Sequence, residues 1–429
     1  MTLPDRPVTC APMSSAAPPS IPARIFKLLS GFGLATSLLV ILMLLTWLAT
    51  LEQVHHGLHT TLQKYFHYSE FWVRPDAAVI FSKLAGQDKY LPPLPGGFWV
   101  CALLVVNLTL GGLIRIRKSW KTAGVVMAHF SIVFMIVAGG VAQLKEERGV
   151  MMLAEKPGGG LPQVADFAQS LTETTIEIAE VKDGKTIGPV HFVKDTYFLD
   201  LDGSERRTVR LPALPFDLEL QGYVQNARPL AATSMAPERG EPLVDGWFLF
   251  SQEPNKETEM DTPGVHVRAL GRDGKKGESF LLAVTARAPH TVVADGRTFA
   301  VTLDKRVWPV PFQVKLLDAR SEYHPNTSRP KLFESDIVRI EDGRESKVFI
   351  EMNEPMRYGG MTFYQRTMMN GVSGGEREAT VSGFEVVRNP SDKWPEYSIY
   401  LAGFGLCFHF LLKLGTFLFR GKSNPVPQA

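Results

Sequence analysis

Apolar residues are concentrated towards the two ends of the chain, in four runs separated by polar stretches. The first run has no charged residue from Leu28 to Leu51, and the others cover residues 98–114, 122–144 and 397–419. Only Lys413 interrupts the fourth run. Because a helix needs about 20 apolar residues to cross a bilayer, each run predicts a transmembrane helix.

Residues 145–396 are polar and have a different period. Four segments alternate apolar and polar residues, as strands with one buried face do: "TIEIAEV", "GVHVRAL", "RTFAVTL" and "FQVKLLD". Asp-Gly pairs, which favour tight hairpin turns, occur at residues 183, 202, 245, 273, 295 and 342. The sequence therefore predicts a membrane protein with four transmembrane helices and a large, mainly-β extracytoplasmic domain, built of sandwich or barrel-like sheets and inserted between helices 3 and 4.

Two segments of this region resemble each other. "LPFDLELQGYV" begins at Leu214 and "VPFQVKLLDAR" begins at Val310, and each has a Pro-Phe pair followed by alternating residues. Duplication of a β unit explains the likeness. Independent use of proline at the start of a strand also explains it.

Basic residues predict the orientation. Arg117 and Lys118 lie between the second and third runs, Arg24 and Lys27 precede the first, and Arg420 and Lys422 follow the fourth. Because loops rich in Lys and Arg stay inside, we expect both termini in the cytoplasm and the β domain outside.

These patterns divide the chain into five parts. We expect a disordered cytoplasmic tail at residues 1–24 and three transmembrane helices within 25–144, with an outer loop at 52–97. The β domain follows at 145–396, then a fourth transmembrane helix at 397–419 and a cytoplasmic tail at 420–429. The tail is rich in Pro, Ser and Ala, and "TWLATLEQ" is a poor cleavage site, so the first run is expected to remain as an anchor.

Composition excludes several functions. The formal net charge is only +2, so no basic field indicates nucleic acid. The three cysteines, Cys10, Cys101 and Cys407, lie outside residues 145–396, which excludes a disulfide framework or a CxxC redox pair there. The β region also has no nucleophile elbow, HExxH motif or phosphate loop, so we expect no enzyme activity from this chain by itself.

Two of the ten histidines lie inside predicted membrane helices: His129 in the third and His409 in the fourth. Counting 1.5 Å per residue places His129 about 10 Å and His409 about 6–16 Å from the inner edge of the bilayer. Ionisable residues inside a membrane are costly and usually face a bundle interior with a function. A neutral imidazole bonded to a neighbouring helix is the structural alternative.

The other histidines have plainer interpretations. His55 and His59 would share a face of one helix, a spacing that can bind a metal, although an amphipathic helix at the membrane surface explains them better. His191, His266, His290 and His324 are expected to be ordinary surface or turn residues.

Haem suits the two membrane histidines. Imidazole is a common axial ligand of haem iron, the macrocycle is apolar, and its propionates are anionic. Lys413 lies four residues after His409 and could meet such an anionic group, or extend to the inner surface. A proton relay would normally bring an intramembrane Asp or Glu, and these runs have none.

Several long strings resemble the ResB family of cytochrome c biogenesis proteins of system II. They are "TLEQVHHGLHTTLQKYF", the segment from "PLPGGFWV" to "MIVAGG", "FESDIVRI", "IEMNEPMRYGGMTFYQ" and "FEVVRNPSDKWPEY". The resemblance implies a subunit of the bacterial inner membrane that transiently binds haem b and helps to present it to apocytochrome c.

The resemblance also implies partners and roles. The implied partner is a CcsA/ResC-type multi-span protein with a tryptophan-rich haem-handling segment, which this sequence lacks. The chain would then be a non-catalytic subunit of a cytochrome c haem lyase complex. The family's haem-ligating histidine in the third helix corresponds to His129, and His409 is a second candidate. Whether the two bind one haem together or pair with a partner's histidines stays open. The alternative function is a membrane-anchored extracytoplasmic assembly scaffold or chaperone that binds no haem.

Overall fold

The computed structural model describes residues 20–80, 91–156, 161–235, 237, 242–272, 276–286, 288–327, 329–373 and 376–420. The expected tails lie outside this range except for residues 20–24 and Arg420, and so does the Asp273-Gly274 turn. The helices are α1 (Ile21–Leu29), α2 (Phe32–His56), α3 (Leu58–Phe66), α4 (Ala77–Ile80), α5 (Gly97–Leu108), the π-helical turn η2 (Thr109–Ile114), α6 (Ala123–Lys145) and α7 (Trp394–Arg420), with short 3₁₀ turns η3 (Asp195–Tyr197) and η4 (Thr258–Met260).

Four of the described helices are long and apolar enough to cross a membrane: α2, α5 with η2, α6 and α7. They coincide with the four apolar runs, so this prediction is confirmed. The most apolar window of α7 is only 6% buried and that of α6 only 11%. Since so much apolar surface is not covered by the chain, the helices need an apolar surrounding, and the protein is a membrane protein.

The first apolar run is not one helix. α1 ends at Leu29 and α2 begins at Phe32, so residues 21–24, expected in the tail, form the first turn of α1. The Asn107 amide of α5 donates to the carbonyl oxygens of Leu29 (2.7 Å) and Gly31 (3.0 Å). This buried amide thus supplies donors where the helix is interrupted, and the Gly31 carbonyl oxygen also accepts from the Ala35 N–H (3.3 Å).

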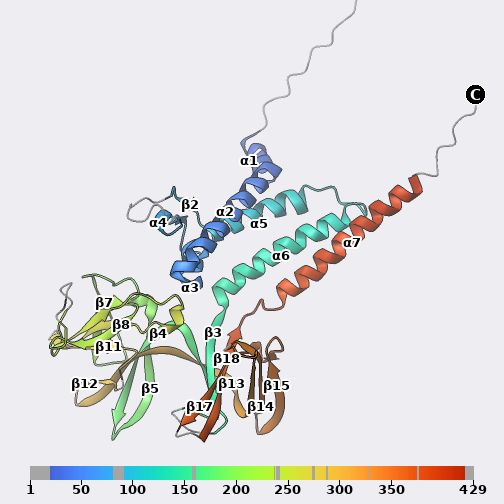
Figure 1. Cartoon of the computed structure of the whole chain (residues 1–429). Helices are drawn as coiled ribbons and strands as arrows, with labels where there is room; N and C mark the ends of the chain where they lie inside the picture. The colour runs from blue at the N-terminus through green and yellow to red at the C-terminus, as the bar shows by residue number, and fades with distance from the viewer. Residues whose placement is uncertain are drawn as a thin grey trace, which may run out of the picture.

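α6 and α7 run antiparallel in close contact (Figure 1). Small buried residues recur every seven positions on both: Gly124, Ser131 and Ala138 on α6, and Gly405, Ser398 and the preceding Ser391 on the α7 side. A Cβ added to Gly405 would lie 2.9 Å from the Gly124 carbonyl oxygen, and Ser391 Oγ donates to the Ala138 carbonyl oxygen (2.8 Å). Small residues let two helix backbones approach closely. We call these six residues the α6–α7 seam.

The helix pair continues directly into a strand pair. α6 ends one residue before β3 (Glu147–Ala154), and β18 (Glu376–Arg388) ends five residues before α7. β3 and β18 are antiparallel neighbours, with Glu147 opposite Arg388. The Asn389 amide donates to the Glu146 carboxylate (3.0 Å) at the junction. Figure 1 shows the two helices entering the β region side by side.

The remaining strands follow β3 in chain order. They are β4 (Val164–Lys182), β5 (Lys185–Lys194), β6 (Arg206–Val209), β7 (Phe216–Val224), β8 (Ala227–Ala231), β9 (Trp247–Ser251), β10 (Gly264–Gly271), β11 (Lys276–Ala283), β12 (His290–Ala294), β13 (Arg297–Tyr323), β14 (Pro330–Glu341), β15 (Arg344–Glu351), β16 (Met356–Tyr358) and β17 (Met361–Ser373). A short pair, β1 (Trp72–Val73) and β2 (Leu94–Pro95), lies among the helices. The expected large β-rich domain is confirmed.

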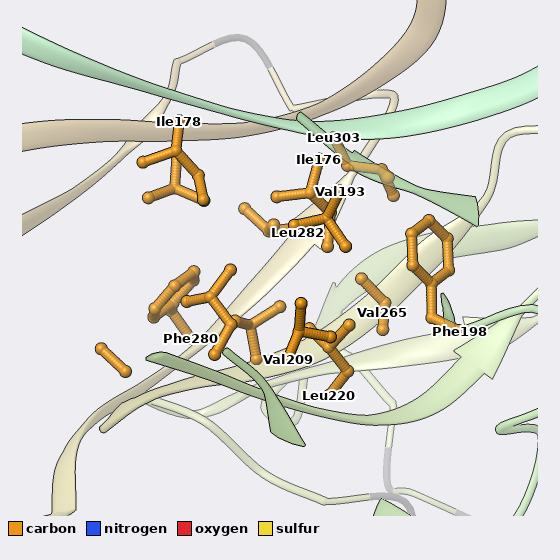
Figure 2. Close-up of a cluster of buried hydrophobic side chains, with 14 of the residues drawn as sticks. Ile176, Ile178, Val193, Phe198, Val209, Leu220, Val265, Phe280, Leu282 and Leu303 are labelled. Carbon is orange, nitrogen blue, oxygen red and sulfur yellow. The ribbon is translucent and has the colours of Figure 1, made fainter. Parts of the chain in front are cut away.

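Two separate cores divide this domain into two lobes. In the first, the four-stranded sheet β11-β10-β7-β6 faces one half of β4 and β13 together with β5 and β12, as a sandwich. Figure 2 shows Ile176, Val193 and Leu303 directed towards Leu220, Val265 and Phe280 across this core. The second core uses the other halves of β4 and β13 with β3 and β14–β18. The long strands β4 and β13 therefore join both lobes.

The two similar segments occupy equivalent positions in different lobes. Phe216, Leu218 and Leu220 of β7 are buried in the first core, and Phe312, Val314 and Leu316 of β13 are buried in the second. The shared alternation thus places three apolar side chains in each core. Duplication stays a prediction, because the two strands have different neighbours.

Asp-Gly turns close four hairpins, as predicted. Asp183-Gly184, Asp245-Gly246, Asp295-Gly296 and Asp342-Gly343 all have positive φ at both residues, the backbone of a type I′ turn. Asp202-Gly203 lies instead in a bend before β6. The strings "RTFAVTL" and "FQVKLLD" belong to one strand, β13, whose pairing with β4 shifts register between Pro309 and Val314.

Candidate functional site

His129 lies on α6, and one hydrogen bond fixes the orientation of its ring. Nδ1 is 2.8 Å from the carbonyl oxygen of Val125, one turn earlier. A carbonyl oxygen can only accept, so Nδ1 carries the proton. In the neutral ring, Nε2 then has a free lone pair, which is the arrangement of a histidine that ligates a metal while its other nitrogen bonds to the backbone.

One glycine of η2, Gly112, makes room for this ring, and its neighbour Gly111 lies against the break between α1 and α2. A Cβ added to Gly112 would overlap the His129 imidazole, lying 2.8 Å from its Cγ. A Cβ on Gly111 would lie 2.8 Å from the Ser30 carbonyl oxygen, at the break between α1 and α2. Single π-helical turns inside α-helices are frequent at functional sites. Sequence reasoning missed Gly111 and Gly112, and the only signal was a Gly-Gly pair within an apolar run.

His409 lies on α7 and packs against α6 at Gly124. A Cβ on Gly124 would lie 2.9 Å from the His409 Cβ. His409 Nδ1 is buried and has no hydrogen-bond partner among the described residues. An unsatisfied buried nitrogen is unfavourable by about 1–3 kcal/mol, so this atom is suited to a further donor or ligand. Lys413 is one turn further along α7 and exposed.

The two membrane histidines lie on different interfaces of α6. His129 contacts η2, whereas His409 contacts α6 on its α7 side, level with Gly124. Gly124 and His129 are five residues apart, which is about 7.5 Å along the helix and about 140° around it. The structure therefore does not bring the two rings together across one site, and this geometry favours separate ligand positions.

Gly57 separates His55 from His59, the pair that the sequence placed on one helix face. α2 ends at His56, and Gly57 has φ +78° before α3 begins at Leu58. His55 and His59 are therefore on different helices, and the expectation of a shared helix face is wrong. α3 turns towards the β domain, where Thr60 Oγ1 is 3.4 Å from Thr258 Oγ1.

His266 also differs from its expected surface position. It is only 8% exposed in β10, and its ring nitrogens contact the carbonyl oxygens of Gly222 (3.4 Å) and Pro242 (3.2 Å). Burial lowers the pKa of this imidazole and outweighs the two contacts. His290 stacks on Phe280 with 3.9 Å between ring centroids. Period-two alternation could not have indicated this burial, since it puts His266 on the opposite face of β10 from the buried Val265 and Val267, and here both faces are covered.

Glu52 is a second residue that sequence reasoning missed. Its carboxylate is fully buried near the C-terminal end of α2, next to α3. It accepts hydrogen bonds from Lys64 Nζ (2.6 Å), Tyr65 Oη (2.8 Å) and the Asp76 backbone N–H (2.6 Å). Burial first, and then the hydrogen bond to Glu52, raise the pKa of Tyr65. The bonds from Lys64 and Tyr65 fix α3 against the end of α2, and the bond from Asp76 fixes the start of α4 there.

The fold and these sites define the class of protein. It is a membrane protein whose membrane-length helices carry histidines and are joined to a β domain of two lobes. Residues 116–382 match the sequence profile described as the ResB-like family, which is more than half of the 429 residues. The chain belongs to the ResB-like family, which agrees with the resemblance found in its sequence and with a role in cytochrome c biogenesis. No curated protein matches the chain.

Proposed function

We propose that this protein is a haem-handling subunit for cytochrome c biogenesis, which carries haem across a bacterial inner membrane and presents it to apocytochrome c. The observation that carries the proposal is the His129 ring, whose Nδ1–H is bonded to the Val125 carbonyl so that Nε2 is available to iron. Haem is the cargo of this site, and its apolar macrocycle suits the surrounding helices.

The proposed orientation has the β domain outside the cell membrane, between transmembrane helices 3 and 4, and both termini inside. α1, the turn between η2 and α6, and the C-terminal end of α7 lie at the end of the helices far from the β domain (Figure 1). Arg115, Arg117 and Lys118 belong to that end. Exposed aromatic residues lie at the opposite end, where the Phe71 ring contacts both Trp72 and Trp99. The basic residues support this orientation, whereas the aromatic residues only mark a membrane–water interface.

The partner in this proposal is a CcsA/ResC-type multi-span protein. Because His129 and His409 lie on different interfaces, each would share a haem with a histidine of the partner. Lys413 would meet a propionate below His409. The chain would hold and transfer haem as a non-catalytic subunit, while bond formation to the haem vinyl groups would belong to the complex.

The test is to express the chain with such a partner, purify the complex and record its Soret absorbance, alongside maturation of a reporter cytochrome c. We expect His129→Ala to remove most of the haem that copurifies and to abolish maturation. His55→Ala, at an exposed position at the end of α2, is the matched control and should leave both unchanged. Full haem content and maturation in His129→Ala would refute the ligand assignment.

A membrane-anchored assembly scaffold or chaperone is the second candidate. The edge strand β5 favours it, because its apolar side chains Ile187, Val190 and Phe192 are exposed, Phe192 by 57%. An unpaired strand edge with apolar side chains can bind an extended client segment. This function predicts no bound haem, and it predicts that substitutions of His129 and His409 are tolerated.

A further inference from the structure

α1, the nine-residue helix before α2, has no buried residue. Its apolar side chains recur at the spacing of one helix face, and they are largely uncovered by the chain, since Ile21 is 74% and Leu28 67% exposed. Arg24 and Lys27, three positions apart, lie together on the polar side. α1 is therefore amphipathic. We call its apolar face the α1 stripe: Ile21, Ile25, Leu28 and Leu29.

The chain does not need α1 to cross the bilayer. From Phe32 to Leu51, next to the buried Glu52 carboxylate, α2 is about 20 residues or about 30 Å long, which matches the thickness of the hydrocarbon core. Residues 21–56 in one straight helix would be about 54 Å long. α2 therefore spans the membrane alone, and α1 lies at or beyond one membrane surface.

The break between α1 and α2 sets the depth of α1. Ser30, at the break, is buried, and its Oγ accepts a hydrogen bond from Arg115 Nη1 (3.4 Å). Arg115 is the first residue after η2, so it begins the basic turn that leads to α6. Because a guanidinium group is costly inside hydrocarbon, this contact places the break close to the membrane surface. α1 therefore begins its course at the level of the lipid headgroups.

The turn between η2 and α6, residues 115–121, exposes an aromatic ring at the same end of the helices. Thr122 Oγ1 closes this turn, because it accepts the Ser119 N–H (3.0 Å) and donates to the Arg117 carbonyl oxygen (2.6 Å). Trp120 within the turn is 81% exposed. Tryptophan is enriched where a membrane meets water, since its ring is apolar and carries one N–H donor. The turn thus has the side chain expected at a membrane surface.

The cations of α1 and of this turn have no acidic neighbours along the chain. No Asp or Glu occurs at residues 6–51 or 89–145. All of these cations are exposed, and α1 contacts η2, from which the turn leads. We call them the basic cluster: Arg24, Lys27, Arg115, Arg117, Lys118 and Lys121. A cluster of about four to eight Lys and Arg residues beside a membrane helix attracts anionic lipid headgroups.

We propose that α1 and the turn of residues 115–121 form a binding surface for anionic phospholipids. The α1 stripe and Trp120 enter the membrane surface, and the basic cluster binds the headgroup phosphates, so that α1 lies along the bilayer. An acidic protein would match the cations alone, whereas a lipid surface matches the cations, the stripe and the ring together. In the proposed orientation this surface belongs to the inner leaflet. The inference is independent of haem, because no residue of the surface is a candidate haem ligand.

The first experiment titrates the full chain in detergent with phosphatidylglycerol or phosphatidylcholine and counts bound lipids by native mass spectrometry. Phosphatidylglycerol, which is anionic, should bind more tightly than phosphatidylcholine, which has no net charge. Arg24→Gln combined with Lys27→Gln should weaken phosphatidylglycerol binding at least tenfold, since each cation near an anionic surface contributes about fivefold. Lys182→Gln combined with Lys185→Gln removes two exposed cations from the β4–β5 hairpin, and this matched control should leave binding unchanged.

The second experiment tests whether α1 lies along the membrane. The full chain, with Cys10, Cys101 and Cys407 changed to Ala, is placed in nanodiscs that contain phosphatidylglycerol. A spin label at Ile25→Cys should be relaxed by oxygen dissolved in the lipid, and one at Lys27→Cys by a water-soluble nickel chelate.

Three results would overturn the inference. The two lipids could bind equally well, or phosphatidylglycerol affinity could be the same with and without Arg24 and Lys27. Both spin labels could also be equally accessible to the nickel chelate, which would place α1 in water. None of these results affects the proposed function, which is decided by copurified haem and cytochrome c maturation in His129→Ala.

Discussion

The buried Glu52 carboxylate is expected to stabilise the junction of α2 and α3, and its contribution is measurable with a double-mutant cycle. Lys64→Met would leave a fully buried carboxylate without its cation, whereas Glu52→Gln would leave Lys64, which is 34% exposed, able to reach water. Removing one partner of a buried ion pair costs about 3–5 kcal/mol when the remaining charge cannot be solvated. We therefore expect a loss near that range for Lys64→Met and about 1–3 kcal/mol for Glu52→Gln, because the amide oxygen still accepts one bond.

The double variant should be more stable than the sum of the single losses predicts. Its coupling energy should be about 1–3 kcal/mol, since both groups share one network. The free energy of unfolding can be measured by SDS titration of the full chain in mixed micelles. Tyr65→Phe, which removes one of the three donors and leaves the ion pair, is the control and should cost about 1 kcal/mol. Strictly additive losses, or Lys64→Met costing less than Glu52→Gln, would refute the view that Glu52 is a buried charge held by Lys64.

Three further predictions concern other parts of the molecule. Gly112→Val should displace the His129 ring, so that copurified haem falls several-fold, because overpacking at this contact costs about 1–3 kcal/mol. Gly405→Leu should separate α6 from α7 and lower the melting temperature of the full chain in detergent, whereas Gly403→Leu, where a side chain meets open space, should not. The free energy of unfolding should fall as the pH drops below 6.5, because burial lowers the pKa of His266 and the unfolded chain then takes up the proton first. Between pH 7.5 and 5.5, unfolding titrations should show a smaller fall in this free energy for His266→Gln than for the unaltered chain.

A different result would contradict each of these three predictions. Unchanged haem content in Gly112→Val would mean that the His129 ring is not held by η2. Equal melting temperatures for Gly405→Leu and Gly403→Leu would contradict close contact at the α6–α7 seam. An equal loss of stability at low pH with and without His266 would assign the titration to another group.

The helices and the β character of the domain were predictable from the sequence, because both depend on local patterns. Apolar runs gave the four long helices, and Asp-Gly pairs gave four hairpin turns in which both residues have positive φ. The break at Ser30 was not predicted from hydropathy, because Ser30, Gly31 and Gly33 carry no charge and so do not interrupt the run, although they are poor helix formers. Asn107, which is distant in the sequence, stabilises this break by donating to the Leu29 and Gly31 carbonyl oxygens.

The candidate site was predictable only in part, for the same reason. His129 and His409 stand out because ionisable residues are rare in apolar runs, but their faces depend on helix packing. That His129 contacts Gly112 and that His409 contacts Gly124 follows from backbone approaches between separate helices. His59 was expected on the same helix as His55, because the helical spacing was extended through Gly57. The helix ends there instead, since Gly57 lies against the Lys256 backbone and the chain turns.

The direct passage of α6 into β3 and of β18 into α7 has a mechanical consequence. A flexible linker would let the helices tilt without moving the domain, but here the helix pair and the strand pair form one continuous ladder, held at the junction by Ser391 and Asn389. If a partner in the membrane slides α6 along α7, the strands must either shear, breaking the pairing of Glu147 with Arg388, or move as one body with both lobes. Because breaking the hydrogen bonds between β3 and β18 is energetically unfavourable, the β domain would rotate as a rigid body. A small shift inside the membrane would become a large displacement at its far edge.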